Sequence, residues 1–352
     1  MLRSMYSGIS GLGTHQAGMD VVGNNIANVN TLGFKAGNAQ FKSSLYQTTA
    51  SSSAGTAVIG GTNAAQMGYG SQIGTIDLQH SNGIYTPSVY GSDVMIDGDG
   101  FFIVGPKPTM DEDAPDGEFY YDLDFLVNWD PSSGDVNGGL EIGDKTDDDG
   151  ASGTTTGDME AFMSTVYLTR VGDFAFDSDG FLCDGQGNVV YGQALGGYAD
   201  GEEFDLLSGF SAVMQPIRLP ANEPYEGSVY TAERIVCSNL TIDNAGKVLI
   251  NDENGELVQI GLLAIAAVQN PTGLTQTSGP YYTVGGNSGV ARPQAAGFNS
   301  TGTLINYGLE SSNVDLSKEF SNMITTQRGF QACAKMITVS DEMLQELVNL
   351  KR

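Results

Sequence analysis

The stretch that decides the fold is LSKEFSNMITTQRGFQACAKMITVSDEMLQELVNL, which runs from Leu316 to Leu350. A row of residues recurs in it every three or four positions, which is typical of one face of an α-helix. The row is Leu316, Phe320, Met323, Gln327, Phe330, Ala334, Ile337, Asp341, Leu344 and Val348, and a second row adds Ile324, Met336, Met343, Leu347 and Leu350. Ser312, Asn313 and Asp315 offer capping side chains. We therefore predict a helix from about 313 to 350, roughly 57 Å long at 1.5 Å per residue.

The N-terminal stretch has the same period. Its row consists of Leu2, Met5, Ile9, Leu12, Gln16, Met19, Gly23 and Ile26. Glycines at 8, 11, 13 and 18 weaken a helix there by up to about 1 kcal/mol each relative to alanine. The N-terminal helix thus needs a partner face, and we expect the two terminal helices to pair as a coiled coil.

Two apolar rows on one long helix allow two interpretations. A helix laid on a globular core would bury both rows within one chain. Alternatively, the rows pack against other subunits. We favour the second interpretation and predict an assembly interface on both helices, formed by Leu2, Met5, Ile9, Leu12, Met19, Ile26, Leu316, Phe320, Met323, Ile324, Phe330, Ile337, Leu344 and Leu347.

The composition excludes several classes of partner. The 352 residues carry 15 Lys and Arg against 42 Asp and Glu, a formal net charge of -27. An acidic surface of this size repels nucleic acid and anionic membranes. No run of 18 apolar residues is present, so we expect no membrane insertion. The first 13 residues lack the apolar core and cleavage site of a Sec signal peptide.

The middle of the chain is predicted to be β-structure, as a barrel-like or sandwich-like domain. Apolar runs alternate with turn residues over 94–104, 166–191 and 238–260, which is the pattern of hairpins. The continuous apolar run at 262–268 predicts one buried strand. Residues 43–71 are rich in Ser, Thr, Ala and Gly and are expected to be extended, or flexible until packed. Residues 108–161 carry 16 acidic residues and one lysine, and we interpret 106–165 as an acidic, outward-facing insertion.

Residues able to support chemistry are sparse. Asp97-Gly98-Asp99-Gly100 and Asp177-Ser178-Asp179-Gly180 resemble fragments of a calcium loop, but neither has the twelve-residue spacing that ends in Glu. Hairpin turns explain both better. The cysteines at 183, 237 and 333 form no CxxC pair, and only two histidines are present. We expect no catalytic residue, no metal and no cofactor.

One twelve-residue string is specific. Asn24 to Lys35 reads NNIANVNTLGFK, which resembles the signature of bacterial flagellar rod, hook and hook-associated proteins. Gly33 permits a sharp exit from the helix, and asparagine tolerates turns. The blocks MIDGDGFFIV (95–104), TRVGDFAFDSDGFL (169–182) and 311–352 resemble the same family in the same order, and SNVDLS with QRGFQ favours hook over distal rod. Within the signature, Asn24, Asn25, Asn28, Gly33 and Phe34 join the predicted interface.

The resemblance implies a hook subunit with a division into domains. These are an inner helical domain (1–33 with 309–352), a connecting region (34–84 with 286–308), a β-domain (85–105 with 166–285) and the acidic insertion (106–165). Such a subunit forms a curved homopolymer, a universal joint between rod and filament. Its implied partners are rod, hook-cap and hook–filament junction proteins, and it leaves the cell through the flagellar type III apparatus. A distal rod protein and a secreted acidic adhesin remain alternatives.

Overall fold

The structure is a computed structural model that describes residues 2–55, 60–107, 127–128, 166–195, 210–219, 239–251, 257–298 and 301–350. The chain forms two compact units. The helical unit consists of Met1–Asn30, Lys35–His80 and Asn313–Arg352, and the β unit consists of Thr31–Phe34 and Ser81–Ser312. The acidic insertion predicted at 106–165 falls almost entirely outside the described residues, as does Cys237.

Both predicted terminal helices are present. Helix α1 runs from Leu2 to Ala27 and helix α3 from Leu316 to Asn349. Of the three capping candidates, Asp315 is the N-cap of α3, because its carboxylate accepts from the backbone N–H of Ser317 at 2.8 Å. The cap satisfies donors that the first turn leaves without helical partners. Neither helix is long and apolar enough to cross a membrane, and the same holds for every other helix in the described ranges.

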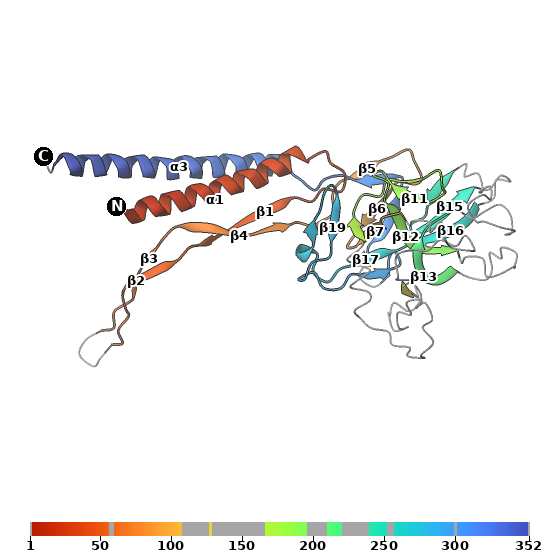
Figure 1. The fold of residues 1–352 in the computed structure, drawn as a ribbon, viewed down its shortest axis with the longest axis horizontal. Coiled ribbons are helices and arrows are strands. Elements are labelled where there is room, and N and C mark those ends of the chain that lie inside the picture. The colour runs from red at the N-terminus through yellow and green to blue at the C-terminus, as the bar shows by residue number, and fades with distance from the viewer. Residues whose placement is uncertain are drawn as a thin grey trace, which may run out of the picture. The chain divides into compact units, whose positions relative to one another are not determined.

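Two antiparallel strand pairs complete the helical unit. Strand β1 (Gly37–Ser43) pairs with β4 (Ser71–Leu78), with a bulge between Gln40 and Phe41. Strand β2 (Tyr46–Ala50) pairs with β3 (Ala65–Gly68). Every residue of β2 and β3 is exposed. The segment expected to be extended thus forms a two-stranded ribbon (Figure 1).

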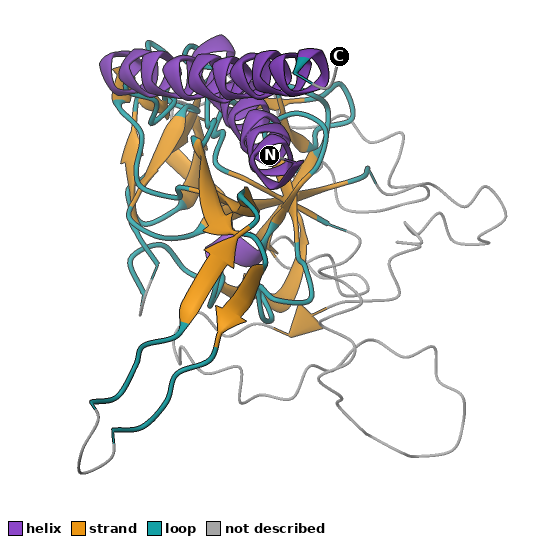
Figure 2. Ribbon diagram, turned by 90° about the vertical axis from the view of Figure 1, so that its left-hand side faces the viewer, coloured by secondary structure: helices purple, strands orange, loops and turns teal. Residues whose placement is uncertain are grey.

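The β unit contains the core. Its strands in chain order are β5 (Tyr85–Pro87), β6 (Val94–Asp97), β7 (Phe101–Gly105), β8 (Val127–Asn128), β9 (Tyr167–Thr169), β10 (Phe174–Phe176), β11 (Leu182–Asp184), β12 (Val189–Leu195), β13 (Phe210–Pro216), β14 (Leu240–Ile242), β15 (Lys247–Asn251), β16 (Leu257–Leu263), β17 (Ile265–Ala267), β18 (Thr275–Gln276), β19 (Tyr281–Thr283), β20 (Arg292–Gln294), β21 (Thr303–Asn306) and β22 (Gly308–Glu310). A short 3₁₀ helix, η1, spans Pro271–Gly273. Figure 2 shows strands and loops making up this unit.

The middle of the chain is β-structure, as predicted. The described strands do not close into a barrel. The main path of the described sheet runs β14-β15-β16-β12-β7-β9-β19-β18 and ends on open strands. Its core packs fully buried apolar side chains, among them Phe102 and Phe174 in an edge-to-face pair at 5.1 Å. Strands β14 and β18, at the two ends of this path, each pair with one described neighbour, so the described sheet does not return on itself.

The strand predictions were right in two places and wrong in two. Strands β10 and β11 form a hairpin, and β14, β15 and β16 form a meander. Strands β6 and β7, predicted as a pair, lie in different sheets: β6 pairs with β21, and β7 with β9, β12 and β17. Gly98 (φ 121°) and Gly100 (φ 131°) turn the chain from one sheet to the other. The single strand predicted at 262–268 is broken at Ala264 into β16 and β17, which pair with different neighbours.

Candidate assembly interface

Helices α1 and α3 lie side by side and antiparallel (Figure 1). A β-carbon built on Gly8 would lie 3.1 Å from Cγ1 of Ile337, and one on Gly18 would lie 3.4 Å from Cγ2 of Thr326. Near the start of α1, the hydroxyl oxygens of Ser4 and Ser340 are 3.5 Å apart. Residue numbers rise along one helix as they fall along the other.

The buried positions of α1 are mostly small or polar residues. They are Gly8, Gly11, Thr14, Gly18, Val22 and Asn25. These glycines lower the helix propensity of α1. Because glycine has no side chain, they also allow close packing of neighbouring elements against the helix backbone. The described members of the predicted apolar row on α1 are half-buried or exposed, and the heptad seam of a coiled coil remains a prediction.

His15 is packed between two elements. A β-carbon on Gly329 of α3 would lie 2.5 Å from Cε1 of the ring. On another side the ring of Phe41, from β1, stands edge-on at 5.9 Å between centroids. The imidazole fills the space that Gly329 leaves, which is a structural role.

Asn25 joins three segments of the helical unit. Its side-chain oxygen accepts from the backbone N–H of Gly37 at 2.9 Å, and its amide nitrogen donates to the Gly37 carbonyl at 2.8 Å. The same nitrogen donates to Oε2 of Glu319 on α3 at 3.2 Å. Both side chains are buried. A single asparagine of the predicted signature thus fixes α1 against α3 and the start of β1.

Asn313 makes a second clamp. Its side-chain oxygen accepts from the backbone N–H of Ala36 at 2.8 Å, and its amide nitrogen donates to the carbonyl of Gln79 at 2.7 Å. The backbone N–H of Gln79 donates to the Ala36 carbonyl at 2.9 Å. Sequence reasoning assigned Asn313 to helix capping, whereas it holds the strands that flank the ribbon.

Gly33 and Phe34 of the signature are buried in the β unit. Gly33 has φ 67°, and a β-carbon there would lie 2.8 Å from Cγ2 of Val171. Its backbone N–H donates to the carbonyl of Glu310 at 2.9 Å. Glycine is required at this exit both for its backbone conformation and for space. Asn24 is exposed, and its side-chain oxygen accepts from Asn28 at 2.8 Å.

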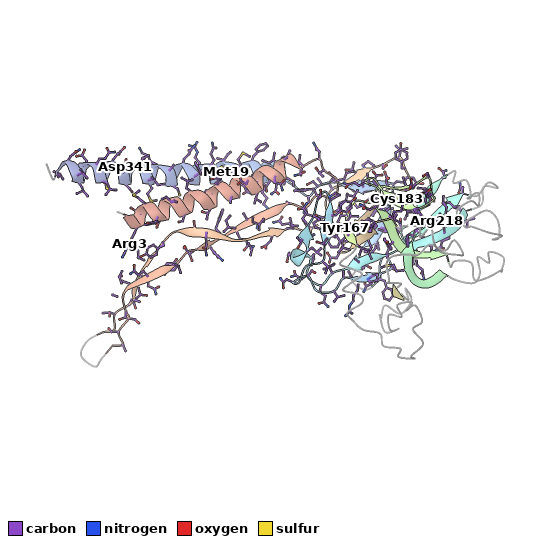
Figure 3. All side chains as sticks on the ribbon, in the orientation of Figure 1. Arg3, Met19, Tyr167, Cys183, Arg218 and Asp341 are labelled. Atoms are coloured by element: carbon purple, nitrogen blue, oxygen red, sulfur yellow. The ribbon has the colours of Figure 1, made fainter. Side chains whose placement is uncertain are left out.

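The predicted apolar interface residues lie on the surface of the helical unit or at its margin. Ile9 (55% exposed), Phe320 (50%), Ile324 (57%), Leu347 (49%) and Leu316 (39%) are exposed. The half-buried members are Met5, Leu12, Met19, Ile26, Met323, Phe330, Ile337 and Leu344. The side chain of Leu2 falls outside the described residues. Figure 3 labels Met19 on α1 and Asp341 on α3 among the side chains of this unit.

Charge is divided unequally between the two units. The helical unit holds eight of the 15 Lys and Arg and seven of the 42 Asp and Glu, a net charge of +1. The β unit therefore holds seven basic and 35 acidic residues, a net charge of -28. Copies of the helical unit can approach one another without the repulsion that the whole chain would predict.

Aspartates of both candidate calcium turns interact with other side chains. Asp177 and Asp179 both pair with the ammonium of Lys107, at 2.7 Å in the case of Asp177. Asp97 accepts from Asn82 at 3.0 Å. Within the described ranges, no three His, Cys, Asp or Glu side chains are grouped as metal ligands would be.

Family models of known proteins match both ends of the chain. The family model for the C-terminal part of flagellar basal body rod FlgEFG proteins matches residues 307–350. The model for flagella basal body rod proteins matches residues 5–35. These ranges contain α3 and α1 with the asparagine-rich signature.

Full-length relatives extend the match to the whole chain. The flagellar basal-body rod protein FlgG of Bacillus subtilis is 35% identical over 353 residues, covering all of both chains. The flagellar hook protein FlgE of Borreliella burgdorferi is 31% identical over 445 residues, and that of Treponema pallidum is 30% identical over 470, again covering all of both chains.

Proposed function

We propose that this chain, which belongs to the family of flagellar basal-body rod and hook proteins and is a structural subunit of the flagellar hook, polymerises through the exposed apolar surface of its helical unit. The observation that carries the proposal is the surface of α3. The exposed large apolar side chains on this helix are Leu316, Phe320, Ile324, Met336, Val339, Met343, Leu347, Val348 and Leu350. Exposed apolar surface of this extent marks an interaction site.

The role that follows is mechanical. Helices of neighbouring subunits form the inner tube. The ribbon and the β unit slide by small amounts between neighbours as the joint turns. We propose no catalysis, because the residues singled out in the sequence serve turns, caps and packing. Rod, cap and junction proteins are the partners expected at the two ends of the tube, and the type III apparatus is the expected export route.

A second candidate is the distal rod. The rod relative from Bacillus subtilis aligns over 353 residues with this 352-residue chain, whereas the two hook relatives need alignments of 445 and 470 residues. A rod subunit would use the same helical surface in a straight tube.

Electron microscopy of flagella from a strain deleted for this gene separates the two candidates. Complete rods without a curved hook, restored by the intact gene, are the result expected for a hook subunit. Truncated rods would assign the chain to the rod. Normal motile flagella would contradict both.

The interface is tested by Phe330→Asp in the complemented strain. A charge placed in a packed apolar contact costs several kcal/mol, so hooks should be lost. Ala332→Asp, two residues along and exposed, adds the same charge off the apolar row and should leave hooks intact. Normal hooks with Phe330→Asp would contradict assembly through this surface.

A further inference from the structure

The apolar surface of α3 is divided into two patches on different sides of the helix. At 3.6 residues per turn, each residue advances about 100° around the axis. The first-half patch consists of Leu316, Phe320, Met323, Ile324 and Phe330. The second-half patch consists of Met336, Val339, Met343, Leu347 and Leu350. Their centres lie roughly 170° apart around the axis by the same count.

Helix α1 occupies the side of α3 between the two patches. The α3 residues that face α1 are Thr326, Gly329, Cys333, Ile337 and Ser340. The two patches therefore lie on opposite flanks of the α1 contact. Val348, in the last turn, is the one exposed large apolar side chain of the second half of α3 that lies on the first-half flank.

The second-half patch is an open surface formed by α3 alone. Its lining residues Val339, Glu342, Met343, Glu346, Leu347 and Leu350 all belong to this helix or to its C-cap. On the first-half patch, Phe320 and Ile324 are half or more exposed. Both patches thus leave apolar side chains in solvent, and a contact between them would bury both.

The charges on the side opposite α1 are complementary between the two patches. Beside the first-half patch this side carries Arg328 and Lys335, both exposed. Beside the second-half patch it carries Glu342 and Glu346, also exposed. Two first-half patches facing each other would bring like charges together, whereas a first-half patch against a second-half patch brings opposite charges together.

We infer that the first-half patch of one subunit docks on the second-half patch of a second copy, with the two α3 helices parallel and staggered by about 19 residues, roughly 28 Å. This inference rests on the proposed function, since it describes how the same helical surface is used. Arg328 and Glu346 are 18 residues apart, so this stagger places them beside each other across the contact. Different patches meeting head to tail form an interface that does not close on itself and continues as a helical polymer.

Cross-linking tests which patches meet. In a background with the three native cysteines replaced by alanine, Ile324→Cys and Met343→Cys are introduced singly and together, and assembled tubes are treated with a short bismaleimide. The inference expects a ladder of covalent multimers from the double variant only, because residues 324 and 343 are too far apart within one helix. Cross-linked dimers from either single variant would show like patches meeting and overturn it.

Charge reversal provides a test that does not need the cysteine-free background. Arg328→Glu and Glu346→Arg should each cause a loss of hooks, and the double variant should restore them. Thr325→Glu, an exposed position on neither patch, is the control and should keep hooks. If single reversals leave hooks intact, or if the double variant stays defective, the staggered pairing is wrong.

Failure of this inference differs from failure of the proposed function. If Phe330→Asp abolishes hooks but the double cysteine variant forms tubes without a ladder, the helical surface is the interface and the pairing of patches is wrong. If Phe330→Asp leaves hooks normal, the helical surface itself is excluded, and the pairing with it.

Discussion

The thiol of Cys333 on α3 lies against the backbone of α1 at Gly11, where a β-carbon would stand 2.8 Å from the sulfur. That distance is too short for carbon and sulfur in van der Waals contact. The two helices are held at a separation that only glycine permits at this position, and the pairing is correspondingly sensitive to added volume.

Gly11→Ala should therefore destabilise the helix pair by about 1 kcal/mol despite the better helix propensity of alanine. Thermal loss of helical circular dichroism from isolated hooks measures the effect. Adding Cys333→Ala should recover most of it, because the clashing sulfur is removed. Gly13→Ala, with no atom within 4 Å of the new methyl group, should be neutral or stabilising by up to about 1 kcal/mol. An equal response at 11 and 13 would contradict the close approach.

Asn25→Leu should cost more than any substitution at Asn24. It removes three hydrogen bonds and leaves the N–H and carbonyl of Gly37 and a buried Glu319 oxygen without this partner. Buried polar groups left unsatisfied cost about 1–3 kcal/mol each, so we expect the three together to cost at least about 3 kcal/mol. Asn24→Ala removes an exposed side-chain contact with Asn28 and should shift stability by less than about 0.5 kcal/mol. The same thermal assay compares the two variants.

The β unit contains a buried ion pair that should be far more important than its exposed counterpart. Arg170 and Glu310 lie 3.6 Å apart and are almost fully buried, and the guanidinium also stacks 5.1 Å from the Phe101 ring. Burial lowers the pKa of Arg170, which Glu310 opposes. Removing one member leaves an uncompensated charge, so Arg170→Met should cost about 3–5 kcal/mol in urea denaturation of the full chain.

Two companion variants make that measurement specific. Arg170→Met with Glu310→Gln removes both charges but keeps an acceptor for the N–H of Gly83, which Glu310 binds at 2.7 Å, so part of the stability should return. Lys107→Met removes a half-exposed pairing with Asp177 and Asp179 and should cost no more than about 1 kcal/mol. Similar losses for Arg170→Met and Lys107→Met would contradict the prediction.

The thiol of Cys183 should react slowly in the folded chain. Burial raises its pKa to about 11 from an ordinary value of 9.0. Since the thiolate is the reactive form, alkylation by iodoacetamide at pH 8 should be about 100-fold slower than at an unperturbed thiol. Val89→Cys, at a position 90% exposed, provides the reference rate, read by mass spectrometry of peptides. Equal alkylation rates at Cys183 and at the Val89→Cys thiol in the folded chain would contradict this prediction. In denaturant the two thiols should react at the same rate.

Hydrophobic periodicity predicted both helices to within a few residues but did not identify the glycines at which they approach most closely. A 3–4 spacing identifies apolar residues on one side of a helix, whereas Gly8, Gly11 and Gly18 carry no hydrophobic signal. They appeared as weak points, and the structure places them at the closest approach to α3. The spacing of small residues every three or four positions was the available signal.

In the β unit, turn residues predicted where the chain changes direction but not which strands pair. Asp177 to Gly180 joins two paired strands, whereas Asp97 to Gly100 joins strands of different sheets. The difference lies in which buried partners are available, such as β21 for β6. Such partners are distant in sequence, and a local pattern does not contain them.

The hydrogen bonds of Asn25 and Asn313 affect how a pulling force on the β unit is transmitted to the helical unit. The backbone passes between the two units at four places, after residues 30, 34, 80 and 312. Asn313 joins the segments that begin at 35, end at 80 and begin at 313, and Asn25 ties the first helix to the same group. A pull on the β unit is therefore shared among four covalent connections. Because α1 ends and α3 begins at the same end of the antiparallel pair, such a pull acts on both helices in the same direction.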